Sequence, residues 1–166
     1  MLEPQPLTIA TQVLYQEGLL LDRREWTAWL SLYAERVVYW VPAWRDEQTE
    51  TRDPAREVSL IYHDSRVGLE ERVMRVRSRQ SVTALPLPRT THFASNIMAT
   101  ARGTEGIEAQ ASWLVHLYDP RTLQERSLCG RVEITLALQS AAWRITHKTV
   151  HLQNDCVAAV LDFYML

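Results

Sequence analysis

The residues of this chain best suited to acid–base chemistry or metal binding are its five histidines: His63, His92, His116, His147 and His151. His147 and His151 are four residues apart, a spacing that suits one metal ion when both lie on a helix. They fall in a predicted strand, however, where four residues span about 13 Å. Zinc bonds to nitrogen are about 2 Å long, so both rings cannot reach one ion. We expect two partly buried histidines with hydrogen-bonded neighbours.

His92 lies in the stretch RTTHFASN, which is predicted to be a strand. In a strand His92 and Asn96 point to the same side. They could present an acid–base pair to a cavity, helped by Asp64 or Tyr62. The alternative is that Arg89, His92 and Asn96 make hydrogen bonds at a strand edge or a subunit contact. We favour the alternative because the sequence fixes no carboxylate beside His92.

Other catalytic motifs are missing from the sequence. The chain has five glycines and no glycine-rich phosphate loop, and it has no Gly-x-Ser-x-Gly elbow. Its two cysteines, Cys129 and Cys156, form no pair that could ligate an iron–sulfur cluster together with histidines. We expect free thiols in a reducing compartment. We therefore predict no catalytic, cofactor-binding or metal-binding residue in this chain.

Length and composition indicate one globular domain spanning residues 1–166. Hydrophobic residues make up 46% and charged residues 23%, which is ordinary for a folded protein. The formal net charge of -2 gives no general attraction to nucleic acid or anionic lipid. No secretory signal and no apolar run of roughly 18 residues is present. We expect a cytoplasmic protein that binds neither nucleic acid nor membrane.

The elements that must position these residues begin with helices. Apolar residues at near-helical spacing predict a first helix beginning near Thr8. Asp22 is predicted to cap a second helix, with Glu25 as its reciprocal partner. That helix carries one wide apolar stripe, which must press onto a flat surface. The stripe consists of Trp26, Trp29, Leu30 and Tyr33.

A short strand over residues 37–41 follows, and Pro42 ends it. Tyr39 and Val41 share one face of this strand and Trp40 lies on the other, so the rings of YWVPAW cannot all line one pocket. Residues 45–57 are predicted to be a long surface loop, which suggests a functional or contact role.

A third helix is marked by Leu69, Val73 and Val76, and arginines lie on or near its polar side. With Glu70 and Glu71 among them, a solvated face is the default interpretation and a contact surface the alternative. These arginines are Arg72, Arg75, Arg77 and Arg79, and the loop LPLPR (residues 85–89) closes this half.

The second half of the chain predicts four long strands, at residues 90–101, 107–118, 123–138 and 143–152. Alternation at period two indicates one covered face, as in antiparallel sheets. The covered face includes Ile107, Ala109, Ala111, Trp113, Val115 and Leu117, then Val132, Ile134, Leu136 and Leu138. Helices first and strands afterwards is the α+β order. We predict N-terminal helices packed on a strongly curved, mostly antiparallel mixed sheet, a cone-shaped half-barrel.

Four blocks of sequence, in order and with sensible spacing, resemble the small (β) subunits of aromatic-ring-hydroxylating Rieske dioxygenases, particularly those acting on benzoate, salicylate or anthranilate. The blocks are LLDRREWTAWLSLYAERVVYWVPAW (20–44), SLIYHDSRVGLEERVMRVRS (59–78), LPLPRTTHFASNI (85–97) and VLDFYML (160–166). One position departs from the family pattern: the family often has a second arginine where this chain has Thr91.

The resemblance implies a fold like that of nuclear transport factor 2 and assembly with a larger α subunit, usually as an α3β3 hetero-hexamer. It implies that the α subunit holds a 2Fe–2S Rieske cluster and a mononuclear Fe(II). It also implies that a ferredoxin or reductase delivers electrons to the complex. The β subunit normally supplies no ligand to either centre. We therefore expect a non-catalytic assembly subunit of an oxygenase that hydroxylates an aromatic carboxylate in the degradation of aromatic compounds.

In such an assembly we expect subunit contacts from Trp40, Trp44, Arg66, Arg72, Arg75, Arg89, His92 and Asn96. Two alternatives stay open. One is a free-standing isomerase or dehydratase of the cone fold that uses His92 with a nearby carboxylate or tyrosine. The other is a small-molecule binding module that tunes substrate choice.

Overall fold

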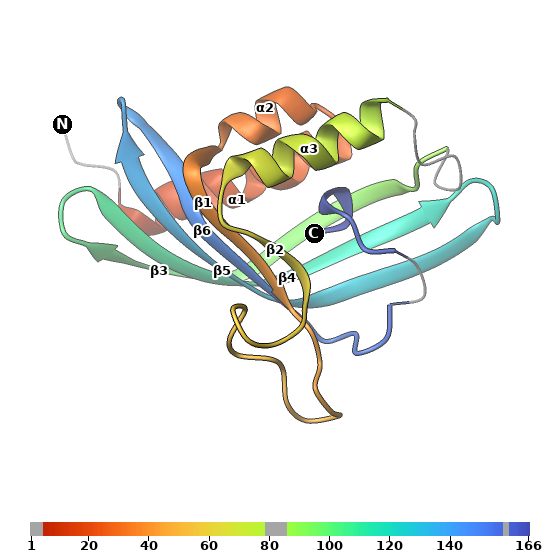
Figure 1. The fold of residues 1–166 in the computed structure, drawn as a ribbon. Coiled ribbons are helices and arrows are strands. Elements are labelled where there is room, and N and C mark those ends of the chain that lie inside the picture. Colours follow the sequence, from red (N-terminus) through yellow and green to blue (C-terminus); the bar gives the residue numbers. More distant parts are fainter. Residues whose placement is uncertain (1–4, 79–85, 158–159) are drawn as a thin grey trace.

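The structure is a computed structural model, and it describes residues 5–78, 86–157 and 160–166. Arg79 and Leu85, predicted to lie in the third helix and the proline loop, fall outside these residues. Three α-helices lie on one side of a strongly curved sheet (Figure 1). They are α1 (Pro6–Asp22), α2 (Trp26–Ser31) and α3 (Arg66–Arg77), and a short 3-10 helix, η2 (Phe163–Met165), ends the chain.

Six strands form the sheet in the order β2-β1-β6-β5-β4-β3. β1 runs parallel to β6, and every other neighbouring pair is antiparallel. The strands are β1 (Tyr33–Pro42), β2 (Ser59–His63), β3 (Arg89–Arg102), β4 (Gly106–Asp119), β5 (Gln124–Gln139) and β6 (Ala142–Leu152). The predicted α+β half-barrel with a mostly antiparallel mixed sheet is therefore confirmed.

The period-two pattern predicts the inner face of the sheet correctly. All six alternating residues from Ile107 to Leu117 on β4 are buried, and their neighbours on the strand are more exposed. On β5, Val132, Ile134 and Leu136 are buried, whereas Leu138 at the strand end is 37% exposed. Alternation thus identifies the covered face, but it does not show where the cover ends.

The first two helices cover this inner face. α1 begins with Pro6 at its first turn, where the missing N–H costs nothing, and it packs against β3. α2 buries Trp26 and Trp29 as predicted. The predicted cap is wrong, because Asp22 ends α1 and its carboxylate accepts hydrogen bonds from β3 instead. Tyr33 also differs from prediction, since it begins β1 and does not continue α2.

Two elements are absent from the sequence-based prediction. β2 has five residues and pairs with the end of β1, and it follows a charged loop without a period. The C-terminal residues Phe163 to Leu166 are buried. Phe163 packs against two rings of α2, edge-on to Trp26 at 5.1 Å and stacked with Trp29 at 4.9 Å between centroids. The chain end therefore belongs to the core of the cone.

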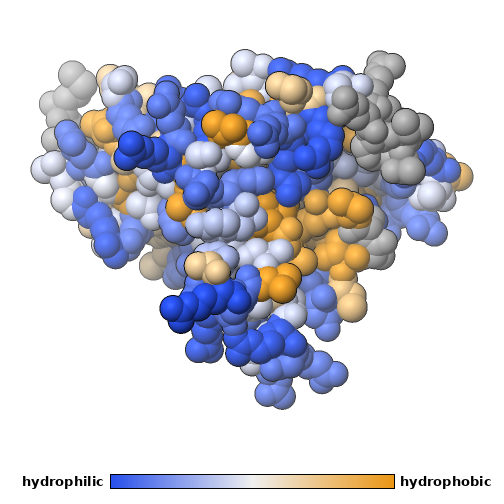
Figure 2. Space-filling view, in the orientation of Figure 1, coloured by the Kyte–Doolittle hydropathy of each residue, from blue (hydrophilic) through white to orange (hydrophobic). Residues whose placement is uncertain are grey.

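The predicted loop between β1 and β2 is confirmed and projects beyond the sheet (Figure 1). An isolated bridge between Trp44 and Glu50 and an ion pair between Arg45 and Glu57 hold it together. Its surface is strongly hydrophilic, as is that of α3, whereas hydrophobic residues gather around the C-terminal segment (Figure 2).

Candidate functional site

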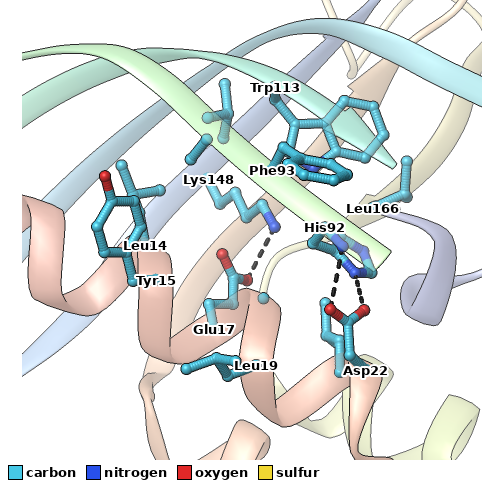
Figure 3. Close-up of a pocket in the computed structure, with 14 residues that line it drawn as sticks. Leu14, Tyr15, Glu17, Leu19, Asp22, His92, Phe93, Trp113, Lys148 and Leu166 are labelled. Carbon is cyan, nitrogen blue, oxygen red and sulfur yellow. Dashed lines mark hydrogen bonds and ion pairs between the residues drawn. The ribbon is translucent and has the colours of Figure 1, made fainter. Parts of the chain in front are cut away.

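A cavity of about 370 Å³ lies between α1 and the inner face of the sheet. Its apolar wall includes Leu14 from α1, Trp113 from β4, Val132 from β5 and Leu166 at the chain end. Its polar side chains come from α1, β3 and β6: Glu17, Asp22, His92 and Lys148 (Figure 3). The cavity therefore combines an apolar wall with a few charged groups, the usual composition of a small-molecule site.

His92 and Asp22 form a dyad at one end of the cavity. His92 Nδ1 lies 2.5 Å from Asp22 Oδ1, and the His92 backbone N–H donates to Oδ2 at 3.0 Å. The Thr90 hydroxyl donates to Oδ1 at 2.9 Å. Burial opposes ionisation of Asp22, but the bonds from His92 and Thr90 outweigh it and hold its pKa below the ordinary value of 3.8. The carboxylate is thus ionised at neutral pH and can accept a hydrogen bond from Nδ1.

Gly18 allows α1 to approach β3 closely enough for this dyad. A Cβ atom at this position would lie 3.0 Å from the Cβ of His92, tighter than ordinary packing contacts. Glycine adds no such atom, so the helix can carry Asp22, one turn further on, up to the strand.

Glu17, Lys148 and Tyr33 form a second buried polar cluster. Lys148 Nζ lies 2.8 Å from Glu17 Oε1, and the Tyr33 hydroxyl donates to the same oxygen. The lysine also lies over the ring of Tyr39, 5.4 Å from its centroid. Burial, and next the charge of Glu17, raise the pKa of Tyr33 well above 10.0, so its hydroxyl keeps its proton. The lysine is held in a buried ion pair with Glu17.

Comparison with known proteins supplies the family. Residues 16–159 match the family model described as the ring hydroxylating beta subunit. The chain belongs to this family. It is 39% identical to the 2-halobenzoate 1,2-dioxygenase small subunit of Burkholderia cepacia, over 91% of this chain and 90% of that one. It is 37% identical to the anthranilate 1,2-dioxygenase small subunit of Acinetobacter baylyi, over 93% of each.

Solved structures agree with this assignment. The beta subunit of the benzoate 1,2-dioxygenase from Burkholderia mallei superposes with a TM-score of 0.81 at 28% identity, over 99% of this chain and 100% of that one. An NTF2-like protein with a cystatin-like fold from Novosphingobium aromaticivorans gives 0.60 at 18% identity, over 93% and 88%, which shows the fold alone. The expected likeness to nuclear transport factor 2 is confirmed.

This ring-hydroxylating β subunit places its predicted contact residues on three separate parts of the fold. Around β1, Trp40 donates to Ser59 Oγ at 2.9 Å, and Trp44 donates to the carbonyl of Leu152 at 2.8 Å. Tyr39 from the same aromatic stretch is buried, and its ring lies 6.1 Å from that of Tyr33. The expected division of YWVPAW between the core and other surroundings is confirmed, while partner contact by Trp40 or Trp44 stays a prediction.

On α3 of the β subunit, the three predicted arginines have different surroundings. Arg66 donates to Glu70 at 2.9 Å, and Arg72 donates to His63 and to Asp162 at 2.8 and 3.1 Å. Arg75 is exposed. Arg72 therefore ties the helix to β2 and to the C-terminal segment within the chain.

On β3, Arg89 is exposed and lies over the ring of Tyr118 at 5.8 Å. His92 faces the cavity and Asn96 does not, contrary to the prediction that they share a side. Asn96 lies in a bulge with a φ of 53° and donates to Ser112 on the outer face at 3.0 Å. An extra residue in a strand reverses the alternation beyond it, which explains the difference.

His147 and His151 of the β subunit also have different surroundings. His147 and His151 lie on β6, as predicted; His151 Nδ1 is 2.9 Å from Glu50, whereas His147 is exposed. Burial of His147 is therefore a wrong prediction.

Within residues 5–78, 86–157 and 160–166, no group of three or more histidine, cysteine or acidic side chains could hold a metal ion. The described helices are also too short or too polar to span a bilayer.

Sequence reasoning did not find the polar partners inside the cone. Tyr62, proposed as a helper of His92, is exposed on the edge strand β2, and the carboxylate beside His92 is Asp22. One signal was available: Lys148 is the only lysine in the sequence, and it occupies an inward position of β6, between Ile145 and Val150. Glu17, likewise, falls among the buried positions of α1.

The contact between Arg72 and His63 predicts a pH-dependent stability. Burial, and next the charge of Arg72, lower the pKa of His63 below 6.5, although Glu71, Asp64 and Asp162 oppose the shift. The unfolded chain therefore binds the proton more readily, so this contribution is complete above about pH 6.5 and is lost as the pH falls towards the lowered pKa. We expect the free energy of unfolding, measured in urea, to fall between pH 7 and pH 5.

His63→Gln is the matched control for this prediction. The glutamine amide oxygen can still accept from Arg72 but does not titrate, so the decrease between pH 7 and pH 5 should become smaller. An equal decrease in the variant would assign the pH dependence to other groups.

Proposed function

We propose that this chain is the small subunit of a multicomponent Rieske non-haem iron oxygenase that hydroxylates an aromatic carboxylate. The carrying observation is the order of similarity among its relatives. Small subunits named for 2-halobenzoate, anthranilate, benzoate and toluate dioxygenases are 34–39% identical to it, whereas that of a benzene dioxygenase is 28% identical. The first four names are those of aromatic acids, and benzene bears no carboxyl group.

In this proposal the chain is an assembly subunit, and the larger α subunit holds the 2Fe–2S Rieske cluster and the mononuclear Fe(II). We expect an α3β3 hetero-hexamer in the cytoplasm that receives electrons from a ferredoxin or reductase. Cys129 and Cys156 are both free thiols, and no metal-ligand group gathers in the described part of the chain, which supports this division of labour. The β subunit would stabilise the α assembly by mass action, since it binds the assembled state.

The exposed arginines are the strongest candidates for contact with the α subunit. Arg75 and Arg89 are exposed, whereas Arg72 and His92 have partners within the chain. The half-buried rings of Trp40 and Trp44 could extend the contact around the projecting loop. Charged contacts at an interface rim act mainly on specificity and on the association rate.

Co-expression with the large oxygenase subunit of a benzoate-type dioxygenase tests the proposed function. We expect the two chains to co-purify at fixed stoichiometry, and we expect α alone to lose oligomeric stability and hydroxylation of benzoate-type acids. A stable and fully active α oligomer without this chain would contradict the proposal.

Charge reversal tests the contact surface. Arg75→Glu combined with Arg89→Glu is expected to weaken the association of α and β at least tenfold, because like charges across an interface cost several kcal/mol. Arg102→Glu, at the far end of β3, is the matched control and should leave association unchanged. Equal effects of both changes would place the contact elsewhere.

A second candidate function is favoured by one observation, the His92–Asp22 dyad beside a cavity. Such a pair could act as a general base in an isomerase or dehydratase. Fold similarity alone cannot support it, because unrelated activities share one fold. Normal hydroxylation by a complex that contains Asp22→Asn would show that the oxygenase does not need the dyad.

A further inference from the structure

An open cleft of about 430 Å³ lies at the start of β1, between the end of α2 and the turn that joins β5 to β6. The start of β1 runs beside β6 at this end of the sheet (Figure 1). Three arginines line the cleft: Arg36 from β1, Arg66 from α3 and Arg144 from β6. Among the described residues that line it, the one carboxylate is Glu35. The lining side chains therefore carry an excess of positive charge.

The arginines of this cleft can be reached from solvent. Arg36 is exposed, Arg144 is half-buried, and the side chain of Arg66 is 30% exposed. Tyr33 and Ala34, which also line the cleft, are 0% and 5% exposed. A molecule that enters from solvent therefore meets guanidinium groups and little apolar surface. This favours a compact polar ligand over an aromatic ring.

Backbone carbonyl groups hold two of the arginines in place. Arg144 donates to the carbonyl of Ser31, and Arg66 donates to that of Tyr33 at 3.3 Å. A carbonyl oxygen fixes a guanidinium without cancelling its charge. Because a guanidinium has five N–H groups, donors remain for a ligand.

Two of the three positive charges have no counter-ion within the described part of the chain. Arg66 pairs with Glu70 at 2.9 Å, whereas Arg36 and Arg144 form no ion pair there, and neither does Glu35. The chain as a whole has a net charge of -2, so any attraction of an anion to this cleft is local. Guanidinium groups match the geometry of oxyanions and make strong charge-assisted hydrogen bonds with them. An anion bound here would also relieve the repulsion between the arginines.

The turn between β5 and β6 adds neutral donors to the cleft. Gln139 and Ser140 both line it and are both exposed. Gln139 pairs with Ala142, so the turn has two central residues, Ser140 and Ala141, with φ values of 50° and 63°. Asn-Gly is the usual choice for such a turn, and side chains other than Gly, Asn and Asp are strained there. The strained turn places an amide and a hydroxyl beside the arginines.

We propose that this cleft binds one oxyanion of the phosphate class, either as the free ion or as the phosphate group of a monoester. A phosphate group presents at least three strong acceptor oxygens in different directions, whereas a carboxylate presents two. Arg36 and Arg144 supply charged donors to it, and Gln139 and Ser140 supply neutral ones. The site goes beyond the proposed assembly role and does not depend on it.

Calorimetric titration of the full-length chain with inorganic phosphate tests the site, with sodium chloride at matched ionic strength as the blank. We expect saturable binding of one phosphate per chain, which added salt should weaken because the arginines are accessible to solvent. Methyl phosphate, titrated in the same way, distinguishes the two sources. Tighter binding than that of phosphate would identify a monoester, and weaker binding would identify the free ion.

Two exposed side chains of the cleft should give changes of opposite sign. Arg36→Gln is expected to weaken phosphate binding about threefold to tenfold, because it removes one charged donor. Glu35→Gln is expected to strengthen binding about twofold to fivefold, because it removes the carboxylate that repels the anion. Arg56→Gln is the matched control, since the Arg56 side chain is 87% exposed in the loop between β1 and β2. It should leave the affinity unchanged.

Absence of saturable phosphate binding beyond the chloride blank would overturn the proposal without any variant. Unchanged affinity in Arg36→Gln, unchanged or weaker affinity in Glu35→Gln, or an equal loss in Arg56→Gln would each overturn it as well. None of these results bears on co-purification with the α subunit, so the two proposals fail separately.

Discussion

Replacing Lys148 with methionine is expected to lower the free energy of unfolding of the chain by about 3–5 kcal/mol, because it leaves a charged carboxylate buried without its partner. Lys148 and Glu17 lie 2.8 Å apart with side chains 2% and 6% exposed. Methionine keeps most of the length and volume of lysine, so lost packing contributes little. The Tyr33 hydroxyl would still donate to Glu17, but one neutral donor does not replace a cation. Urea unfolding followed by tryptophan fluorescence measures the change.

Two further variants separate the charge from other effects. Glu17→Leu combined with Lys148→Met removes both charges and should recover much of the loss, because apolar replacement of a whole buried pair is often neutral. Arg102→Met removes one partner of the exposed Arg102–Glu108 pair and should change stability by less than about 1 kcal/mol. If Lys148→Met costs no more than this control, the pair does not anchor α1 to the sheet.

The sequence predicts the sheet well because its signal is repeated along each strand. Six buried residues at period two on β4 outweigh any single exception, and β5 follows the same rule as far as Leu136. Hydrophobic alternation depends only on the hydrophobicity of successive residues within one strand, and this can be read directly from the sequence. The order of helices before strands then leaves few ways to cover the inner face.

The site is less predictable because each of its polar contacts joins distant segments. Glu17 and Lys148 are 131 residues apart, and Asp22 and His92 are 70 apart. Asp22 followed by Glu25 satisfies the local pattern of a helix cap, and tertiary hydrogen bonds from β3 replace that local role. Asn96 shows the same limit on a smaller scale, since a bulge with positive φ cannot be told from a regular strand by alternation.

The buried chain end leads to the second large effect. Phe163→Ala is expected to lower the free energy of unfolding by about 3–5 kcal/mol, the usual cost of deleting a buried aromatic ring. Phe163 is 0% exposed and packs against Trp26 and Trp29 at 5.1 and 4.9 Å between centroids. Favourable ring geometry adds about 0.5–1.5 kcal/mol per pair beyond area burial. The midpoint of urea unfolding should fall while its slope stays the same.

Val160→Ala is the matched control, in the same segment but with 87% of the residue exposed. It should change stability by no more than about 0.5 kcal/mol, as expected for a surface position. Asp162 holds the segment from a second side through its 3.1 Å contact with Arg72, so the ring need not be its only attachment. A cost below about 1 kcal/mol for Phe163→Ala would mean that this polar contact, and not the aromatic cluster, holds the C-terminal segment against α2. A large cost would make the last four residues part of the core that closes the cone.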